Sequence, residues 1–232
     1  MNVLRSIKTL FFIMVFAICS VVTVNAYDNN EVTSENNPIS IEEFNRLKSE
    51  GVYGEDVTYE NLINSLKDEF VLNDKTEVDS KAAYSPKAGD IVITSSTSSS
   101  GITGHAGIFI DGTSILHIQG PGHKPSTLTW TQWKSKYPKT WVYRTTKSNV
   151  NQKAADWARI NYKDKAYTYQ INTKWGDKNP TYCSKIVWQA YYFGTGNLPV
   201  MKAPGRAFIV APYSLPNYFN SAYAPTKVYD NR

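Results

Sequence analysis

Residues 105–119 read HAGIFIDGTSILHIQ and predict a β-hairpin. Successive side chains of a strand point to opposite faces, so parity assigns each residue to a face. The even positions of both arms are apolar: Ala106, Ile108, Ile110, Leu116 and Ile118. If the loop is Asp111–Thr113, with an odd number of residues, His105 and His117 share the other face. His105 then lies opposite Gln119 and diagonal to His117, whereas a two-residue loop would separate the histidines.

A second stretch, residues 181–192, reads TYCSKIVWQAYY and predicts a buried helix with Cys183 in its first turn. The partial positive charge at a helix N-terminus stabilises a thiolate, which is the reactive form of cysteine. Cys183 is therefore a candidate nucleophile. Most free cysteines are small buried apolar residues, so the placement alone leaves both roles open.

A thiol that faces two imidazoles has the layout of a nucleophile, a base and an orienting group. Each strand histidine could instead hydrogen-bond the backbone and be structural. His123, in the loop at 120–124, is expected at the surface or at the rim of the site, with no assigned role. The short ligand spacings typical of zinc are missing among the histidines and Cys183, so we expect no metal and no cofactor.

The first 26 residues predict a signal peptide, and with it a secreted or cell-wall-associated protein. They have a basic start, an apolar run at 10–24 and a small-x-small ending at Ala26. Ile18 precedes Cys19 where a lipoprotein signal needs a small residue, so we expect no lipid anchor. No later stretch approaches the roughly 20 apolar residues of a membrane span.

Charge is unevenly distributed along the chain. Residues 27–87 carry 14 acidic and 6 basic side chains, a balance of −8, whereas residues 88–232 carry 6 and 17, a balance of +11. A basic body attracts anionic polymers, so peptidoglycan or another anionic cell-envelope polymer is the expected partner. Nucleic acid is not favoured, because the basic residues are scattered. The acidic front could cover the body as an inhibitory pro-region. The oligomeric state is not predicted.

The expected organisation is an acidic segment at 27–86 followed by one domain at 87–232. The acidic segment contains two short helices, the first with a capping box that begins at Ser40 and the second ending near Phe70, and a linker at 71–86. The domain is expected to be α+β, with an antiparallel sheet packed against the cysteine helix. Expected elements are strands at 89–94, 105–119 and 140–143, irregular chain at 120–139, and helices at 149–162 and 183–193.

Four motifs resemble the circularly permuted NlpC/P60 papain-like hydrolases, and the YiiX/YycO-type branch is the nearest match. They are KAGDIV at 87–92, GHAGIFI at 104–110, ILHI at 115–118 and YCSKIVWQAY at 182–191. The resemblance extends over about residues 85–220. It implies a permuted papain-like fold in which the histidine-bearing sheet precedes the cysteine helix.

The resemblance also implies site residues: Cys183 as nucleophile, His105 as general base and His117 as the orienting group. Many members of the branch carry Glu at the third position, whereas two histidines at this spacing resemble the lecithin:retinol acyltransferase relatives. This departure concerns the substrate more than the mechanism. The family's oxyanion-binding tyrosine matches Tyr167 best and Tyr169 second, although its upstream glycine is missing here. Either tyrosine could instead pack on the sheet.

The function that these observations favour is an exported cysteine peptidase or amidase. It would cleave amide bonds in peptidoglycan peptides through a thioacyl intermediate on Cys183. One alternative is a lipid acyl hydrolase or acyltransferase of the lecithin:retinol acyltransferase type. Another is a catalytically silent binding module.

Overall fold

The computed structural model describes residues 37–67, 84–96 and 104–231. The chain divides into two units, residues 1–34 and 35–232, and every described residue belongs to the second. The predicted signal peptide at 1–26, Phe70 and most of the predicted linker lie outside the described residues.

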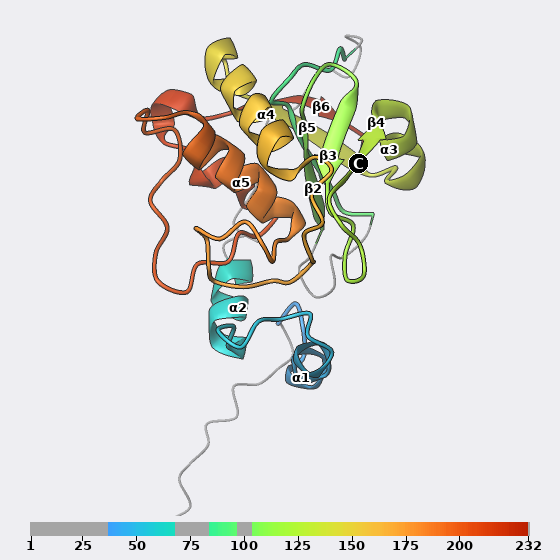
Figure 1. Ribbon diagram of the computed structural model, residues 1–232, viewed down its shortest axis with the longest axis vertical. Helices are drawn as coiled ribbons and strands as arrows, with labels where there is room; N and C mark the ends of the chain where they lie inside the picture. Colours follow the sequence, from blue (N-terminus) through green and yellow to red (C-terminus); the bar gives the residue numbers. More distant parts are fainter. Residues whose placement is uncertain (1–36, 68–83, 97–103, 232) are drawn as a thin grey trace, which may run out of the picture. The chain divides into compact units, whose positions relative to one another are not determined.

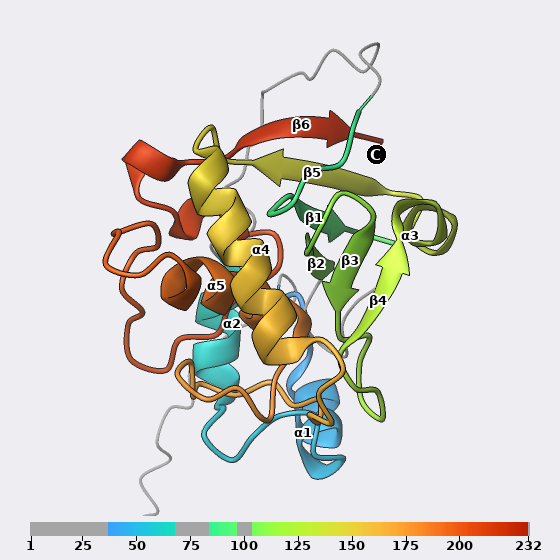
Figure 2. The same cartoon turned by 45° about the horizontal axis from the view of Figure 1, so that its top comes forward.

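One antiparallel sheet organises the second unit, with the strand order β4-β3-β2-β1-β5-β6 (Figures 1 and 2). The strands are β1 (Ile91–Thr94), β2 (His105–Phe109), β3 (Ser114–His117), β4 (Ser126–Thr129), β5 (Thr140–Arg144) and β6 (Thr226–Asp230). The helices are α1 (Ile41–Ser49), α2 (Tyr59–Lys67), α3 (Trp130–Lys136), α4 (Ser148–Tyr162) and α5 (Cys183–Gly194), with 3₁₀ turns at Leu215–Tyr218 and Ser221–Tyr223. The predicted α+β class, with an antiparallel sheet packed on the cysteine helix, is confirmed.

The register of the β2–β3 hairpin confirms the parity argument. Ile108 pairs with Leu116, and the neighbouring positions pair in the same register. The loop between the arms is Asp111–Thr113, closed by a 2.9 Å hydrogen bond from Ile110 N to Ser114 O. Three loop residues keep the even positions of both arms on one face of the sheet.

The two faces of the sheet bury different cores. The even-numbered face of β2 and β3 packs with α4 and α5 in a large cluster that includes Ala106, Ile108 and Cys183. The odd-numbered face forms a smaller, more aromatic cluster with α3, which includes Phe109 and Trp133. Figure 2 shows α4 and α5 together beside the sheet and α3 next to β4.

Residues 120–139, expected to be irregular, contain β4 and α3, so that prediction was wrong. Helix α3 begins after Thr129, whose side chain and that of Gln132 form a reciprocal capping box. Trp133 is fully buried, and its burial stabilises the seven-residue helix on the sheet. Tertiary packing and a cap thus order a stretch whose glycine and proline content is typical of loops.

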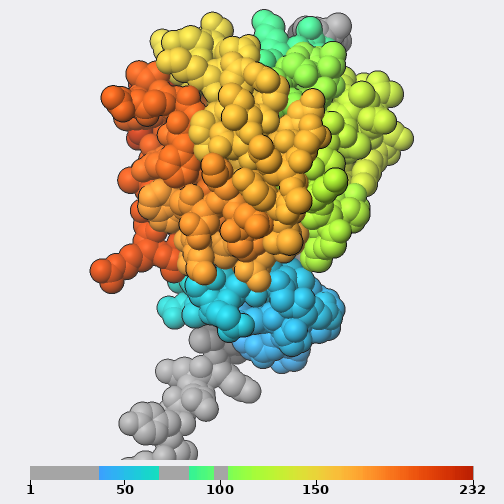
Figure 3. All heavy atoms as spheres, viewed as in Figure 1, coloured from blue at the N-terminus to red at the C-terminus, as the bar shows by residue number. Residues whose placement is uncertain are grey.

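Helices α1 and α2 belong to the same core as the domain. As predicted, Ser40 caps α1, with its Oγ accepting a bond from Glu43 N at 3.2 Å. The chain between the helices forms a parallel bridge, Tyr53 to Ile171, with hydrogen bonds on both sides of it. Asp56 accepts 2.6 Å bonds from the backbone and the hydroxyl of Thr173. Figure 3 shows the blue to cyan segment seated against the orange part of the chain.

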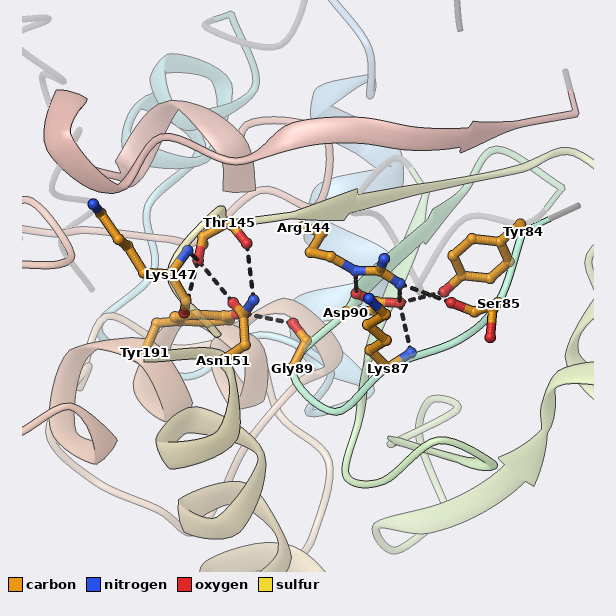
Figure 4. Close-up of polar contacts among 10 residues, drawn as sticks. All are labelled: Tyr84, Ser85, Lys87, Gly89, Asp90, Arg144, Thr145, Lys147, Asn151 and Tyr191. Carbon is orange, nitrogen blue, oxygen red and sulfur yellow. Dashed lines mark hydrogen bonds and ion pairs between the residues drawn. The ribbon is translucent and has the colours of Figure 1, made fainter. Parts of the chain in front are cut away.

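A buried carboxylate cluster lies where β1 begins (Figure 4). We use this name for Asp90, Arg144, Tyr84 and the backbone of Lys87. The Asp90 carboxylate accepts two 2.5 Å bonds from Arg144, one of 2.5 Å from the Tyr84 hydroxyl and one of 2.9 Å from Lys87 N. These bonds join the start of β1 to β5 on the neighbouring side of the sheet.

The adjacent contacts connect β1 to the helices. The Tyr191 hydroxyl, from α5, bonds to Gly89 O and lies 3.0 Å from Asn151 Oδ1 of α4 (Figure 4). Gly89 has a φ of +83°, and a Cβ there would come within 2.5 Å of Asn151 O. Glycine is therefore required both by the backbone conformation and by the close approach of α4.

Candidate active site

His105 and His117 form a hydrogen-bonded pair, which we call the histidine pair. His105 is the first residue of β2 and His117 the last of β3, and the hairpin register puts both on one face. The His105 Nε2 and His117 Nδ1 atoms are 2.9 Å apart. One of these two nitrogens carries the proton of the bond. Since the bond occupies Nε2 of His105, a reaction at that ring takes place at Nδ1.

Both imidazoles are neutral at neutral pH. The exposed fraction is 0% for His105 and 2% for His117. Burial, followed by the charges of His117 and Lys136, lowers the pKa of His105 well below its ordinary value. Burial, followed by Lys136 and His123, lowers the pKa of His117 to about 4. A neutral imidazole can accept a proton, so the pair is in the state that a general base requires.

Two aromatic rings pack against the histidine pair, that of Trp133 in α3 and that of Tyr137, the C-cap residue of α3. We call these two rings the aromatic wall. The Trp133 ring stacks on His105, with 5.4 Å between centroids and 13° between planes, and meets His117 edge-on at 5.5 Å. The Tyr137 ring lies 5.2 Å from that of His105. Trp133 Nε1 donates a 3.0 Å bond to Thr140 Oγ1, which ties this wall to β5. The orientation of both imidazoles is therefore fixed by packing.

Cys183 is the first residue of α5, as predicted. Its exposed fraction is 0%, so the sulfur is covered in this structure. The first-turn N–H groups of a helix have no partner within the helix, and they favour negative charge at this position. The next residue, Ser184, donates a 2.6 Å bond to Val210 O and holds the turn against the chain beyond α5.

Both ends of α5 are anchored by buried polar side chains. Near Cys183, Lys185 Nζ donates bonds to Asn172 Oδ1 at 2.9 Å and to Pro180 O at 3.2 Å. Burial lowers the pKa of Lys185 to about 8. At the other end, Tyr191 bonds to Gly89 O. These contacts fix the position of the helix on the sheet and, with it, the position of the thiol.

Three tyrosines lie within electrostatic range of Cys183, and one of them, Tyr137, also contacts His105. Cys183 lies close enough to three phenols for its charge to add to burial in raising their pKa: Tyr137, Tyr169 and Tyr182. Tyr137 also packs on His105. Tyr137 thus contacts His105 and lies within electrostatic range of Cys183.

The two tyrosines that the resemblance suggested occupy different places. Tyr169 is buried, and its phenol is one of those affected by Cys183. Tyr167 is half-buried, and its ring lies 5.7 Å from that of Tyr162. Both line a hollow of about 640 Å³ together with His123 and Lys124. His123 is exposed on the rim of this hollow, as predicted.

The sequence did not predict the contribution of α3 and of its C-cap residue Tyr137 to the surroundings of the histidine pair. Trp133, Tyr137 and Lys136 all act on the histidine pair, through ring contacts or charge. The signal that could have found them is the capping motif Thr129-x-x-Gln132, which is followed at once by tryptophan. The prolines and glycines around this stretch instead favour irregular chain.

Two further observations concern the described residues alone. No helix there combines the length and the apolar character that crossing a bilayer requires. No group of three or more His, Cys, Asp or Glu side chains in residues 37–67, 84–96 and 104–231 is arranged to hold a metal ion.

Comparisons with known proteins place the chain in a family. It is 40% identical over 170 residues to an uncharacterized 30.3 kDa protein of Bacillus thuringiensis, which covers 68% of this chain and 62% of that protein. The chain thus matches less than two thirds of that relative's length. The crystal structure of the metalloprotein yiiX from Escherichia coli O157:H7 superimposes with a TM-score of 0.46 at 18% identity, over 63% of this chain and 98% of that one. The family model described as lipoprotein N-acylation protein LnsA-like matches residues 57–229, and the chain therefore belongs to the LnsA-like family.

Proposed function

We propose that Cys183 forms an acyl thioester and passes the acyl group to an amine. The observation that carries this proposal is the neutral, hydrogen-bonded histidine pair, together with Tyr137, which packs on His105 and lies within electrostatic range of the thiol at the start of α5. Such a set activates a thiol without a metal, because the imidazole takes the thiol proton and the second ring fixes its orientation. These are the roles that the resemblance to permuted papain-like enzymes assigned to Cys183, His105 and His117.

Acyl transfer proceeds in two stages, acylation of Cys183 and transfer to the amine. His105 Nδ1 accepts the Cys183 proton, and the thiolate adds to the carbonyl carbon of an acyl ester. The tetrahedral intermediate collapses, the ester C–O bond breaks, and the leaving alcohol takes the proton from His105. An amine then adds to the thioester carbonyl and loses a proton to His105. The C–S bond breaks, the amide is released, and the thiolate regains the proton.

The oxyanion of each intermediate needs hydrogen-bond donors. We propose the Cys183 backbone N–H as one, because the N-terminus of α5 favours negative charge at this position. Of the two predicted tyrosines we favour Tyr169 over Tyr167 for this role, since the phenol of Tyr169 is affected by the charge of Cys183. Burial and Cys183 raise the pKa of Tyr169 well above its ordinary value, so it stays protonated and able to donate.

Two observations support the choice of an acyl donor and an amine as substrates, namely the family description and the hollow lined by Tyr167 and Tyr169. The family description names N-acylation of lipoproteins, which makes an amine the acceptor and the cell envelope the location. The hollow beside Tyr169 has aromatic walls and a basic rim at His123 and Lys124, which suits an acyl group joined to an anionic portion. Because the sulfur is covered, side chains around Cys183 must move before a substrate can react. Tyr169 is a candidate for this movement, since it lines the hollow and its phenol is affected by the charge of Cys183.

Peptidoglycan peptides are the second candidate substrate. The same thiolate chemistry cleaves an amide when water replaces the acceptor amine, and the +11 balance of residues 88–232 favours an anionic polymer. Export by residues 1–26 and an inhibitory role of the acidic segment are further proposals that fit either substrate. A silent binding module would have no need of an activated thiol.

The test offers both substrates to purified wild type and to Cys183→Ala. One reaction contains diacyl phospholipid vesicles with an isotope-labelled acyl chain and a lipopeptide with a free N-terminal amine. The other contains peptidoglycan fragments. Products are followed by mass spectrometry. We expect labelled N-acyl lipopeptide from wild type alone. Amide cleavage in the fragments would favour the peptidase, and no product from either reaction would favour the binding module.

A further inference from the structure

The charge of Cys183 adds to burial in raising the pKa of three tyrosines, Tyr137, Tyr169 and Tyr182. Their hydroxyl groups differ in the hydrogen bonds that they make. The Tyr182 hydroxyl accepts a 3.0 Å bond from Val210 N and is engaged in holding the chain beyond α5. Tyr169 already has a role in the proposed function. For the Tyr137 hydroxyl we find no hydrogen bond within residues 37–67, 84–96 and 104–231. Among the three tyrosines, Tyr137 is therefore the one whose hydroxyl can donate a hydrogen bond to a substrate without giving up one to the described part of the chain.

The position of Tyr137 is fixed from several sides. Its ring packs 4.7 Å from Trp133 and 5.2 Å from His105, and 3% of the residue is exposed. Its backbone N donates a 2.7 Å bond to Trp133 O, and its carbonyl accepts a 2.7 Å bond from Thr140 Oγ1. A side chain held by its ring and its backbone loses little conformational entropy when its hydroxyl binds a ligand.

We propose that Tyr137 is a further catalytic residue, whose hydroxyl donates a hydrogen bond to the oxyanion formed at Cys183. The inference rests on the proposed function. Burial and then Cys183 raise the pKa of Tyr137 to about 12, so the phenol keeps its proton throughout the neutral range. It therefore acts as a hydrogen-bond donor and exchanges no proton with the substrate. The negative charge that appears on the acyl oxygen strengthens this bond in the transition state.

The experiment uses p-nitrophenyl butyrate, whose leaving group needs no protonation, so the rate reports on the thiolate and the oxyanion. Tyr137→Phe keeps the ring and removes the hydroxyl. We expect kcat to fall roughly 10²-fold with KM changed less than about threefold, since one oxyanion donor is lost. Alkylation of Cys183 by iodoacetamide forms no oxyanion. The alkylation rate of Tyr137→Phe should therefore stay within about twofold of wild type at each pH.

Tyr229→Phe is the matched control, because Tyr229 packs against the same aromatic core cluster. It should behave as wild type in both assays. Unchanged kcat in Tyr137→Phe would overturn the inference. So would a parallel loss of kcat and alkylation rate, or a lowered melting temperature that accounts for the loss, because each indicates a structural role. If wild type itself fails to turn over the ester, the proposed function fails rather than this inference alone.

Discussion

The carboxylate cluster and the histidine pair are both buried and both belong to the same sheet, yet they use their hydrogen-bonding capacity differently. Asp90 is fully buried and receives four hydrogen bonds, two of them from a guanidinium that carries the opposite charge. The two histidines bind each other through one nitrogen each and remain neutral.

This difference separates a structural role from a chemical one. The Asp90 carboxylate is buried and already accepts four hydrogen bonds, and these bonds join the start of β1 to β5. In the neutral imidazole that donates the bond between the two rings, the second ring nitrogen carries no proton and can take one up. Both groups are buried, so their partners distinguish them: Asp90 is paired with a cation, whereas the histidines are paired with each other. Each prediction below disturbs one cluster and leaves the other intact.

Loss of the general base should give the largest effect. In His105→Gln the side chain keeps a polar group in the aromatic wall but can no longer accept the thiol proton. We expect kcat/KM for acyl transfer to fall by roughly 10³-fold, within the range for general-base catalysis. Initial rates with a labelled acyl donor measure this. A variant that keeps more than a tenth of wild-type activity would show that another group takes the proton.

Breaking the carboxylate cluster should affect stability instead. Arg144→Met leaves the Asp90 carboxylate buried without its cation, which we expect to lower the free energy of unfolding by about 3–5 kcal/mol. Urea denaturation followed by circular dichroism measures the loss. Activity per folded molecule should remain near that of wild type. A marginal change in stability together with lost activity would reverse the assignment of the two clusters.

Acid should destabilise the histidine pair. Burial holds the pKa of His117 at about 4, against an ordinary value of 6.5, so the unfolded chain binds more protons in this window. Stability is therefore complete above pH 6.5 and falls as the pH drops toward 4, by up to about 3 kcal/mol from this group. Urea denaturation between pH 7 and pH 4.5 measures the slope. His117→Gln should reduce the slope to the part due to His105, whose pKa burial also lowers, and an unchanged slope in that variant would contradict the account.

Removing a single partner of Asp90 should have the smallest effect. Tyr84→Phe deletes one of four bonds to the carboxylate and leaves the Arg144 ion pair in place. We expect the free energy of unfolding to fall by about 1–2 kcal/mol, with activity unchanged. Thermal unfolding of the variant beside wild type detects this. A loss as large as that of Arg144→Met would mean that the ion pair depends on the phenol.

The sequence predicted the hairpin well, because a strict alternation over both arms keeps the apolar residues on one face only if the loop has an odd number of residues. The helix position of Cys183 followed in the same way from an apolar stretch that is closed by Gly194. Local pattern is enough where the apolar residues follow the period of the element, as in this hairpin and this helix. The pairing of the two histidines depended only on this local register.

Other features depend on contacts between distant parts of the chain. Strand β6, at 226–230, pairs with β5 some eighty residues earlier, and Asp56 bonds to Thr173 across 117 positions. The aromatic wall of α3 has the same origin, since a seven-residue helix is stable only when Trp133 is buried against the sheet. For that reason Tyr137 could not be placed beside His105 from sequence pattern alone.

The most direct test of the central claim is the mass of the protein during turnover. Wild type is mixed with an acyl donor, quenched in acid and analysed intact, with peptide mapping of Cys183. The account predicts a mass increase of one acyl group on Cys183, removed by neutral hydroxylamine as a thioester is, and no increase in Cys183→Ala. Turnover by wild type without such an adduct, or turnover that survives in Cys183→Ala, would contradict it.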